Sequence, residues 1–232
     1  MQIIVEEGVK IVFTSAGNPK TWTSILKEKG ITVVHVVSSA KFAKKAEDAG
    51  VDAVVAEGFE AGGHNGREET TTMVLIPQVV DAVKIPVIAA GGIASGKAML
   101  AAFALGAEGV QIGSRFVASL ESSAHENFKN KVIHTQEGET LLTLKELTPV
   151  RLIKNKFFQS VEEAKLQGAS ADELKALLGK GRAKKGMFEG DLDEGELEIG
   201  QVAASIKEIK SAGEIVREIM REFDEKRKSF NV

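Results

Sequence analysis

The sequence predicts an α/β protein in which helices cover a parallel sheet, followed by a helical region. Short apolar segments rich in β-branched residues recur along the first half of the chain. Each is followed by a loop, a stretch of helical periodicity and a glycine. The segments are apolar on both faces, which is typical of parallel strands buried between helices. They recur at about 20 to 25 residues, the length of one strand–helix unit. A doubly wound sheet and a (β/α)8 barrel both have this pattern.

The first half of the chain contains five expected strands and a sixth candidate. They span residues 9–14, 32–37, 53–56, 86–90 and 109–112, with the sixth candidate at 140–144. Helices are expected between them, at residues 19–30, 39–50 and 96–106 and from Pro77 onward. Proline suits a first helical turn because its missing N–H would have no partner there. Glycine suits the end of a helix because it adopts the left-handed conformation easily.

The chain changes character after Pro149. Residues 161–178 and 201–226 have helical periodicity, and a loop rich in glycine and lysine and an acidic turn lie between them. We therefore expect two domains. Residues 1–150 would form the strand–helix domain, and residues 151–232 would form a helical C-terminal subdomain that completes the face carrying the site.

Composition excludes several functional classes. The chain has 43% apolar and 27% charged residues, a net charge of −3 and no cysteine. The composition is ordinary for a globular protein. The small negative net charge gives no strong electrostatic attraction to nucleic acid or to an anionic membrane. The missing cysteines exclude disulfides, zinc–thiolate sites and cysteine nucleophiles. Since no secretory leader and no apolar run of about 20 residues occurs, we expect a cytoplasmic protein with neither membrane nor nucleic acid as a partner.

The histidines and carboxylates show no spacing typical of a metal site. Asp191, Asp193 and Glu194 resemble a calcium loop only faintly, because the following residues do not match its positions. We expect a solvated acidic turn there and no bound metal. His35 lies inside a strand pattern and is expected to be structural.

Two glycine-rich loops that follow neighbouring strands indicate a phosphate site. Gly91-Gly92 follows the fourth expected strand, and Gly113-Ser114 follows the fifth. Glycine lets backbone N–H groups approach an anion without a Cβ in the way, and a serine hydroxyl adds a donor. The alternative for Gly91-Gly92 alone is a tight turn between a strand and a helix.

His64 lies in a third loop, after the strand at 53–56, and four glycines surround it at Gly58, Gly62, Gly63 and Gly66. An imidazole titrates near neutral pH, so His64 could donate a proton or a hydrogen bond to a bound ligand. A surface histidine without a role fits the spacing equally well.

Taken together, these loops resemble one family. The segments 57–64, 85–93 and 111–116 and the loop Gly17-Asn18-Pro19 occur in the order found in FMN-dependent enoyl-acyl-carrier-protein reductases and nitronate monooxygenases. The resemblance implies a (β/α)8 TIM-barrel type fold with FMN at the carboxyl ends of the strands. It also implies that His64 is the catalytic residue beside the flavin. The implied cofactor-binding residues are Glu57, Gly62, Gly63, Gly91, Gly92, Gln111, Gly113 and Ser114.

Two reactions are consistent with this resemblance. Glu57-Gly58 and the tail around Gly200-Gln201 favour the enoyl reductase branch, in which NAD(P)H reduces FMN and the flavin reduces an enoyl thioester carried by acyl carrier protein. The alternative is a nitronate monooxygenase that oxidises alkyl nitronates with O2. Non-enzymatic alternatives are a module that binds a phosphate ligand and an inactive remnant. A homodimer is among the expected assemblies.

The resemblance also implies that the barrel is incomplete at the N-terminus. Members of the family begin with strands that precede the one starting here at Val9, and the first carries a loop that contacts the flavin ring. A mis-assigned or truncated start, a separate chain that supplies the missing part, and an inactive remnant are the three explanations. For each of them we expect the chain as given to bind FMN weakly and to turn over little.

Overall fold

The computed structural model describes residues 1–230 and divides the chain into two compact units, which are treated separately below. Unit 1 contains residues 1–59, 68–90 and 101–111. Unit 2 contains residues 60–67, 91–100 and the chain from Ile112 onward. These units are defined by packing, and both are assembled from separate stretches of sequence. Whether residues 1–150 and 151–232 form domains of their own stays a prediction.

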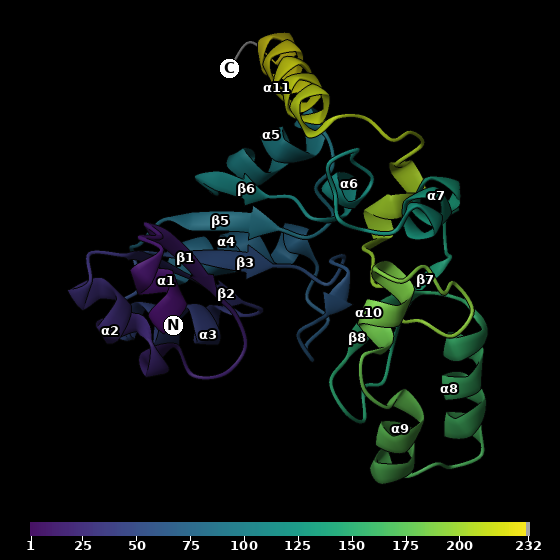
Figure 1. The fold of residues 1–232 in the computed structure, drawn as a ribbon. Coiled ribbons are helices and arrows are strands. Elements are labelled where there is room, and N and C mark those ends of the chain that lie inside the picture. Colours follow the sequence, from purple (N-terminus) through teal and green to yellow (C-terminus); the bar gives the residue numbers. More distant parts are fainter. Residues whose placement is uncertain (231–232) are drawn as a thin grey trace. The chain divides into compact units, whose positions relative to one another are not determined.

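Unit 1 is built on a five-stranded parallel sheet (Figure 1). Its strands are β1 (Ile11–Thr14), β2 (Thr32–Val37), β3 (Ala53–Glu57), β5 (Val87–Ala90) and β6 (Gly109–Gln111). The order across the sheet, β1-β2-β3-β5-β6, is the order along the chain, and every neighbouring pair is parallel. A doubly wound sheet reverses direction at a switch point, whereas successive strands of a barrel do not. The topology therefore favours the barrel type over the doubly wound alternative.

The helices of unit 1 connect these strands as the pattern predicts. They are α1 (Gln2–Glu6), the 3-10 helix η1 (Pro19–Thr21), α2 (Thr23–Glu28), α3 (Ala40–Asp48) and α4 (Thr72–Ala82). A further helix, α5 (Gly96–Ala104), carries the chain from unit 2 back into unit 1. The expected start of a helix at Pro77 is wrong, because Pro77 lies inside α4. The carbonyl that loses its partner there belongs to Met73, an exposed residue on the first turn.

The core of unit 1 consists of small and β-branched side chains. Val34, Ala53, Val55 and Ala90 form one buried cluster on β2, β3 and β5. His35 is buried in the same sheet, and its Nδ1 lies 2.7 Å from the hydroxyl of Thr14 on β1. This confirms His35 as a structural residue of the strand.

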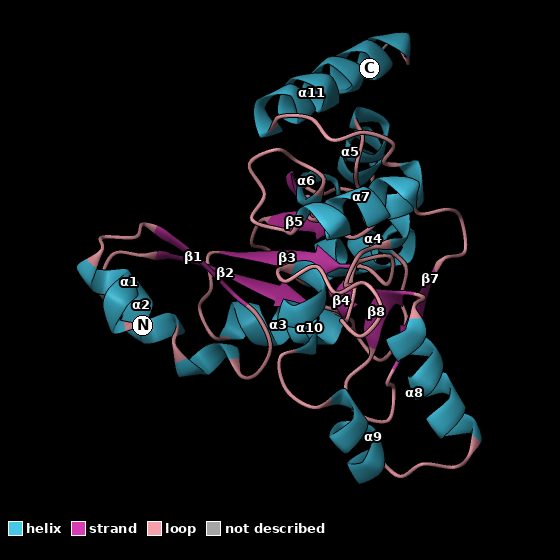
Figure 2. Cartoon of the chain, turned by 45° about the vertical axis from the view of Figure 1, so that its right-hand side comes forward, coloured by secondary structure: helices cyan, strands magenta, loops and turns pink. Residues whose placement is uncertain are grey.

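Unit 2 contains a three-stranded antiparallel sheet (Figure 2). It consists of β4 (Gly63–His64), β8 (Val150–Ile153) and β7 (Thr140–Thr143), in that order. The segment at 140–144 is therefore a strand, but the expectation that it continues the parallel series is wrong. It pairs with β8, which follows it after a short connection, and such a connection can join only antiparallel strands.

The helices of unit 2 are mostly short. They are α6 (Ser114–Val117), α7 (Glu126–His134), α8 (Lys156–Leu166), α9 (Ala171–Leu178), α10 (Arg182–Met187), the 3-10 helix η2 (Gln201–Ser205) and α11 (Ala212–Ser229). The helix expected at 161–178 is two helices, because Gly168 has a left-handed φ of +80° between them. The helix expected at 201–226 begins instead at Ala212, where Ser211 and Glu214 form a capping box.

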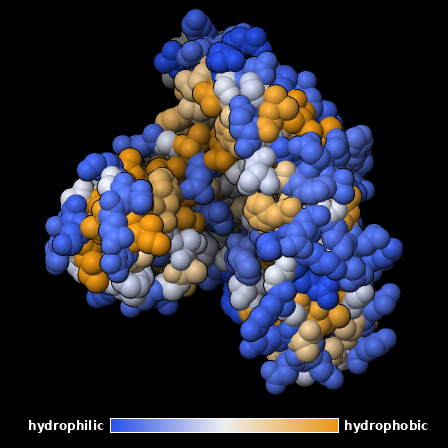
Figure 3. Space-filling model, viewed as in Figure 1, coloured by the Kyte–Doolittle hydropathy of each residue, from blue (hydrophilic) through white to orange (hydrophobic). Residues whose placement is uncertain are grey.

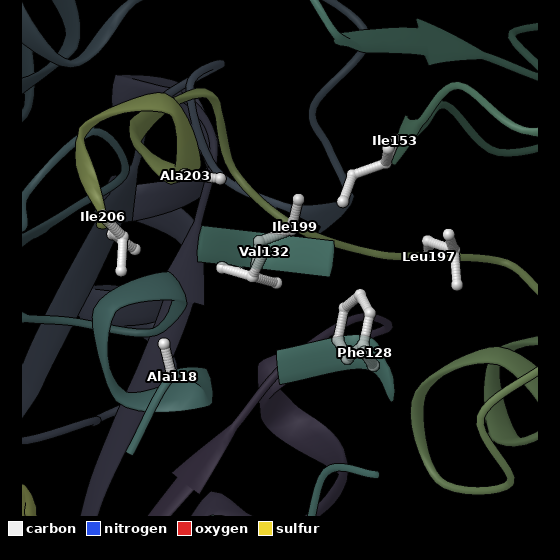
Figure 4. Close-up of a cluster of buried hydrophobic side chains, with 8 residues drawn as sticks. All are labelled: Ala118, Phe128, Val132, Ile153, Leu197, Ile199, Ala203 and Ile206. Atoms are coloured by element: carbon white, nitrogen blue, oxygen red, sulfur yellow. The ribbon is translucent and has the colours of Figure 1, made fainter. Parts of the chain in front are cut away.

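Two apolar clusters hold unit 2 together. Figure 4 shows the first, in which Phe128 and Val132 of α7 lie with Leu197 and Ile199 from the segment before η2 and with Ala203 of η2 itself. The second joins β8 to α8 and α9. The segment at 197–203 is thus fixed in place by burial of its apolar side chains, and the candidate site depends on that segment.

Candidate functional site

Three segments that are far apart in sequence converge in unit 2. The backbone N–H of Gln201 donates a hydrogen bond to the carbonyl of Glu60 (2.9 Å). The backbone N–H of Gly200 donates to the hydroxyl oxygen of Ser114 (2.9 Å). The loop before β4, the start of α6 and the start of η2 therefore meet around Gly200. This junction brings together loops that the sequence marked separately.

The junction is too tight for side chains at two of its glycines. A Cβ on Gly62 would lie 2.4 Å from the carbonyl carbon of Ile199 and 2.5 Å from the nitrogen of Gly200. A Cβ on Gly200 would lie 2.8 Å from the carbonyl oxygen of Glu60 and 2.9 Å from the hydroxyl of Ser114. The two backbones cross at a separation that only glycine permits. The sequence placed Gly200 in the Gly200-Gln201 pair but did not indicate a structural role for it.

Gly91 and Gly92 belong to the same region of unit 2. Both have left-handed backbones, with φ of +93° and +71°, so any other residue would be strained there. A Cβ on Gly92 would lie 3.3 Å from the Cβ of Glu60, the residue whose carbonyl accepts from Gln201. The loop after β5 therefore adjoins the loop before β4.

Gly113 differs from these glycines. It precedes the single turn of α6, its φ is −101°, and a Cβ placed on it would meet nothing within 4 Å. The residue is exposed. Neither backbone conformation nor packing within the described chain requires glycine here, which leaves an open surface beside Ser114.

His64 is an exposed side chain on a fixed backbone. It ends β4, where it pairs with Val150 of β8. On its other side, the N–H of Asn65 donates to the carbonyl of Pro149 (2.9 Å). The Asn65 amide also donates to the carbonyls of Ala61 (3.0 Å) and Gly63 (2.9 Å), which closes the loop on itself. The imidazole is thus presented to solvent from a position that the backbone determines.

Glu198 is a residue of this region that the sequence did not reveal as functional. Its backbone bridges Leu152 of β8, and its carboxylate oxygen lies 2.7 Å from where a Cβ of Gly63 would be. Desolvation by burial raises the pKa of Glu198, and the charge of His64 acts in the opposite direction. The alternation Glu196-Leu197-Glu198-Ile199 was the available signal, because it is typical of a strand with two acidic side chains on one face.

Glu196 lies beside Glu198 on this segment and is buried. Burial, and then the charge of Glu198, raise the pKa of Glu196 to about 7, while Arg182 acts against the shift. The pKa values of both carboxyl groups, which lie two residues apart, are thus raised. Perturbed carboxyl groups of this kind concentrate at functional sites, although structural networks produce them too.

The two remaining candidates belong to the sheet of unit 1. Glu57 is the last residue of β3 and Gln111 is the last residue of β6, so both lie at the carboxyl edge of the parallel sheet. Burial raises the pKa of Glu57 to about 7. Side chains at this edge commonly form the site in parallel α/β folds. Their roles as cofactor contacts stay predictions.

The other candidates have local structural roles. His125 caps α7 and accepts from the N–H of Asn127, and Asp191 accepts from the N–H groups of Asp193 and Glu194. No group of three or more His, Cys, Asp or Glu side chains that could hold a metal ion occurs among residues 1–230. Within the same residues, no helix combines the length and apolar character needed to cross a membrane.

Comparison with known proteins gives a consistent family. A family model described as "Nitronate monooxygenase" matches residues 1–222. A probable nitronate monooxygenase of Staphylococcus saprophyticus is 39% identical over 175 residues, which cover 70% of this chain and 49% of that protein. This chain spans about half the length of the curated relatives it matches.

Solved structures agree with this match. FabK from Thermotoga maritima is 42% identical with a TM-score of 0.93, and the match covers 99% of this chain and 73% of that one. A nitroalkane oxidase from Streptomyces ansochromogenes is 28% identical with a TM-score of 0.82, and the match covers 99% of this chain and 68% of that one. Because one family model spans nearly all of the sequence and the fold agrees, the chain belongs to the nitronate monooxygenase family, as its loop motifs predict.

Proposed function

We propose that this chain forms part of an FMN-dependent oxidoreductase that reduces an enoyl thioester of acyl carrier protein with NAD(P)H. The observation that carries this proposal is the closer likeness to FabK, with 42% identity against 28% for the nitroalkane oxidase. FabK is the neighbour that supports the enoyl reductase branch. The features that favour this branch in the sequence, Glu57-Gly58 and Gly200-Gln201, point the same way.

The residues of unit 2 fit the phosphate end of FMN. The open surface at Gly113 leaves room for a ligand beside Ser114, whose hydroxyl accepts from Gly200 and keeps its own proton for donation. Gly91 and Gly92 provide a backbone without Cβ atoms that a phosphate can approach. We assign these four residues, with Gly62 and Gly63, to the cofactor. Glu57 and Gln111 are assigned to it by resemblance.

FMN, when bound, supplies the hydride chemistry that no amino-acid side chain can perform. The protein's own task is to hold and polarise the substrate. His64 is assigned to the thioester carbonyl, where an N–H of its imidazole would donate a hydrogen bond to the oxygen as negative charge develops. The fixed backbone of β4 supports this role because it holds the exposed His64 at one position. Glu198 adds a carboxyl group next to the same loop.

A second candidate reaction is the oxidation of alkyl nitronates with O2. It is favoured by the description of the matching family model and by the name of the curated relative. In this reaction His64 would bind the nitronate anion or act as a base. Both candidates use the same cofactor site, so they differ only in substrate and electron donor.

The test begins with a titration of FMN into the purified chain. Binding is measured by the quenching of flavin fluorescence. We expect saturable binding that Ser114→Ala weakens, since one donor is lost. The loaded protein is then mixed without oxygen either with NADH or NADPH, or with an alkyl nitronate. Bleaching of the flavin absorbance by the nicotinamide supports the enoyl reductase, whereas bleaching by the nitronate alone supports the second candidate. Failure of any flavin to bind at saturating concentration contradicts both.

The substrate is tested separately with a longer protein that contains this chain. The acceptor in this test is a crotonyl thioester. Reoxidation of the reduced flavin by the thioester under anaerobic conditions is the expected result. His64→Asn should slow that step while leaving FMN affinity unchanged. An unchanged rate in His64→Asn would remove His64 from the proposed role.

A further inference from the structure

The proposed reaction needs a proton donor in addition to His64. Reduction of an enoyl thioester places a hydride on the β-carbon and a proton on the α-carbon. His64 is assigned to the carbonyl oxygen, where its N–H donates a hydrogen bond, so a second protic group has to reach the α-carbon. Because the α-carbon is two bonds from that oxygen, the donor must lie beside His64.

Glu198 lies next to His64 along one edge of β8. His64 is paired with Val150 of this strand. The backbone of Glu198 bridges Leu152, two residues further along, and the other edge of β8 pairs with β7. Residues opposite each other project from the same face of a sheet, and so do residues two apart on one strand. His64 and Glu198 therefore project from one face, at positions about 7 Å apart along the edge.

The side chain of Glu198 is turned to this face because its two neighbours are turned away from it. Leu197 and Ile199 are both buried in the apolar cluster on α7 (Figure 4). Alternation along an extended segment then places Glu198 on the opposite side. Its carboxylate reaches the loop of His64, since one oxygen lies 2.7 Å from where a Cβ of Gly63 would be. All of these residues belong to unit 2, so the arrangement depends only on contacts within that unit.

Glu198 is suited to keep a proton that an ordinary glutamate has lost. Burial raises the pKa of Glu198, and the charge of His64 acts in the opposite direction. The other charged groups around this edge are Glu196 on the same segment, Arg182 on α10 and the buried Arg151 on β8. A carboxyl group whose pKa is raised by burial stays protonated to a higher pH, and enzymes use such groups as general acids.

Two neighbouring carboxyl groups are placed less well for this task. The Cγ of Glu60 lies 3.5 Å from where a Cβ of Gly92 would be, so this side chain adjoins the loop assigned to the cofactor. Glu196 is two residues beyond Glu198 and is buried, and its N–H donates to the carbonyl of Arg182 (3.1 Å). Glu198 is only partly buried, so a ligand can reach its carboxyl group.

We propose that Glu198 is the catalytic acid that protonates the α-carbon of the enoyl thioester while His64 binds its carbonyl oxygen. As the hydride bonds to the β-carbon, the π electrons of the double bond pass to the α-carbon, which takes the proton from the carboxyl O–H of Glu198. The O–H bond breaks and leaves a carboxylate, to which water returns a proton. The inference rests on the proposed enoyl reductase activity, because oxidation of a nitronate saturates no carbon–carbon double bond.

Glu198→Gln keeps the size of the side chain and removes its acidic proton. In the longer protein, reoxidation of the reduced flavin by the crotonyl thioester should slow about a hundredfold. Reduction of the flavin by NADH or NADPH should be unchanged, because that step brings no proton to carbon. Glu198→Asp keeps an acid and should recover part of the lost rate.

Glu163→Gln is the matched control, because Glu163 is an exposed glutamate on α8. In Figure 3, hydrophilic side chains dominate the surface of α8 that is turned to the viewer. This variant makes the same chemical change away from the candidate site. We expect both the reduction and the reoxidation of the flavin to keep their wild-type rates.

The pH dependence separates a proton donor from a residue that only supports the fold. The wild-type reoxidation rate should fall as pH rises through the pKa of Glu198, because only the protonated carboxyl group can donate. Glu198→Gln should lose this dependence. A measurement without flavin is the carbon-13 NMR titration of labelled glutamate carboxyl groups in the 232-residue chain, in which the Glu198 signal is identified by its absence from Glu198→Gln. We expect that signal to titrate above the usual range for glutamate, and higher still in His64→Asn.

Two results would overturn the role of Glu198 and leave the proposed function intact. One is a wild-type rate of reoxidation in Glu198→Gln, and the other is a Glu198 carboxyl group that titrates within or below the usual range. A wild-type protein whose reduced flavin the thioester does not reoxidise would instead contradict the enoyl reductase activity itself, and the role of Glu198 would fail with it.

Discussion

Gly62→Ala is expected to destabilise the junction around Gly200 severely. The new methyl group would lie 2.4 to 2.6 Å from three backbone atoms of Ile199 and Gly200. Backbone atoms cannot rotate away as a side chain can, so the segment at 199–201 would have to move. That movement would break the bond from Gln201 to Glu60 and the bond from Gly200 to Ser114.

The size of the effect follows from these two contributions. Overpacking of a close contact costs about 1–3 kcal/mol, and each lost hydrogen bond costs about 1 kcal/mol. We take the lower end of their sum and expect a loss of about 3 kcal/mol in the free energy of unfolding. For a chain of this length, that loss corresponds to a fall of about 6–12 °C in the thermal midpoint. Circular dichroism melts of the wild-type chain and the variant measure it.

Gly113→Ala is the matched control, because the same methyl group would meet nothing within 4 Å and φ at Gly113 is already negative. We expect its stability to remain within about 0.5 kcal/mol of the wild-type value. If Gly62→Ala melts within a degree or two of Gly113→Ala, the crossing of the two backbones does not require glycine, and the reasoning fails. The control has a second use, since weaker FMN binding in a fully stable Gly113→Ala protein would show that the open surface receives the cofactor.

Three further predictions concern single side chains. Burial raises the pKa of Glu57 to about 7, so its ionisation should cost stability as pH rises from about 4.5, with the full cost above pH 7. Glu57→Gln should therefore stabilise the chain by up to about 3 kcal/mol at pH 8 and leave it unchanged at pH 4, as urea unfolding at both pH values would measure. Arg182→Lys should cost about 2–3 kcal/mol in urea unfolding, since lysine loses the forked hydrogen bonds to three carbonyls and the contact over the Phe157 ring; a loss below 0.5 kcal/mol would contradict this. Ser114→Ala leaves the N–H of Gly200 without its acceptor and should cost about 1 kcal/mol, while Ser119→Ala, which loses only a local bond to Phe116, should cost less.

The parallel sheet of unit 1 could be predicted from the sequence because its strands have a strong local signal. Residues 32–37 and 53–57 are rich in valine and alanine and are buried on both faces, so no amphipathic pattern competes with the assignment. The sixth strand was located correctly but assigned to the wrong sheet. Its partner, β8, lies only a few residues beyond it, and partner choice depends on the connection and not on the strand's own composition.

The candidate site was predictable where glycine marks a close approach and unpredictable where tertiary packing decides. The sequence marked Gly91 and Gly92 because they are consecutive glycines after an expected strand, and both have positive φ. For Glu198 the alternation at 196–199 was the one available signal, and it could not predict the position beside Gly63, which results from the pairing of the segment with β8. A glutamate in an acidic region is also usually solvated, and only the burial of Leu197 and Ile199 turns this segment inward.

The junction around Gly200 also determines when the loops of the candidate site can take up their positions during synthesis. Residues near 60, 114 and 200 must all be present before the hydrogen bonds from Gly200 and Gln201 close. Contacts between such distant parts of a sequence form slowly, since the loop-closure entropy must be overcome first. A nascent chain on the ribosome therefore cannot hold the loops at Gly62 and Ser114 in register until the segment around Gly200 and Gln201 has been made.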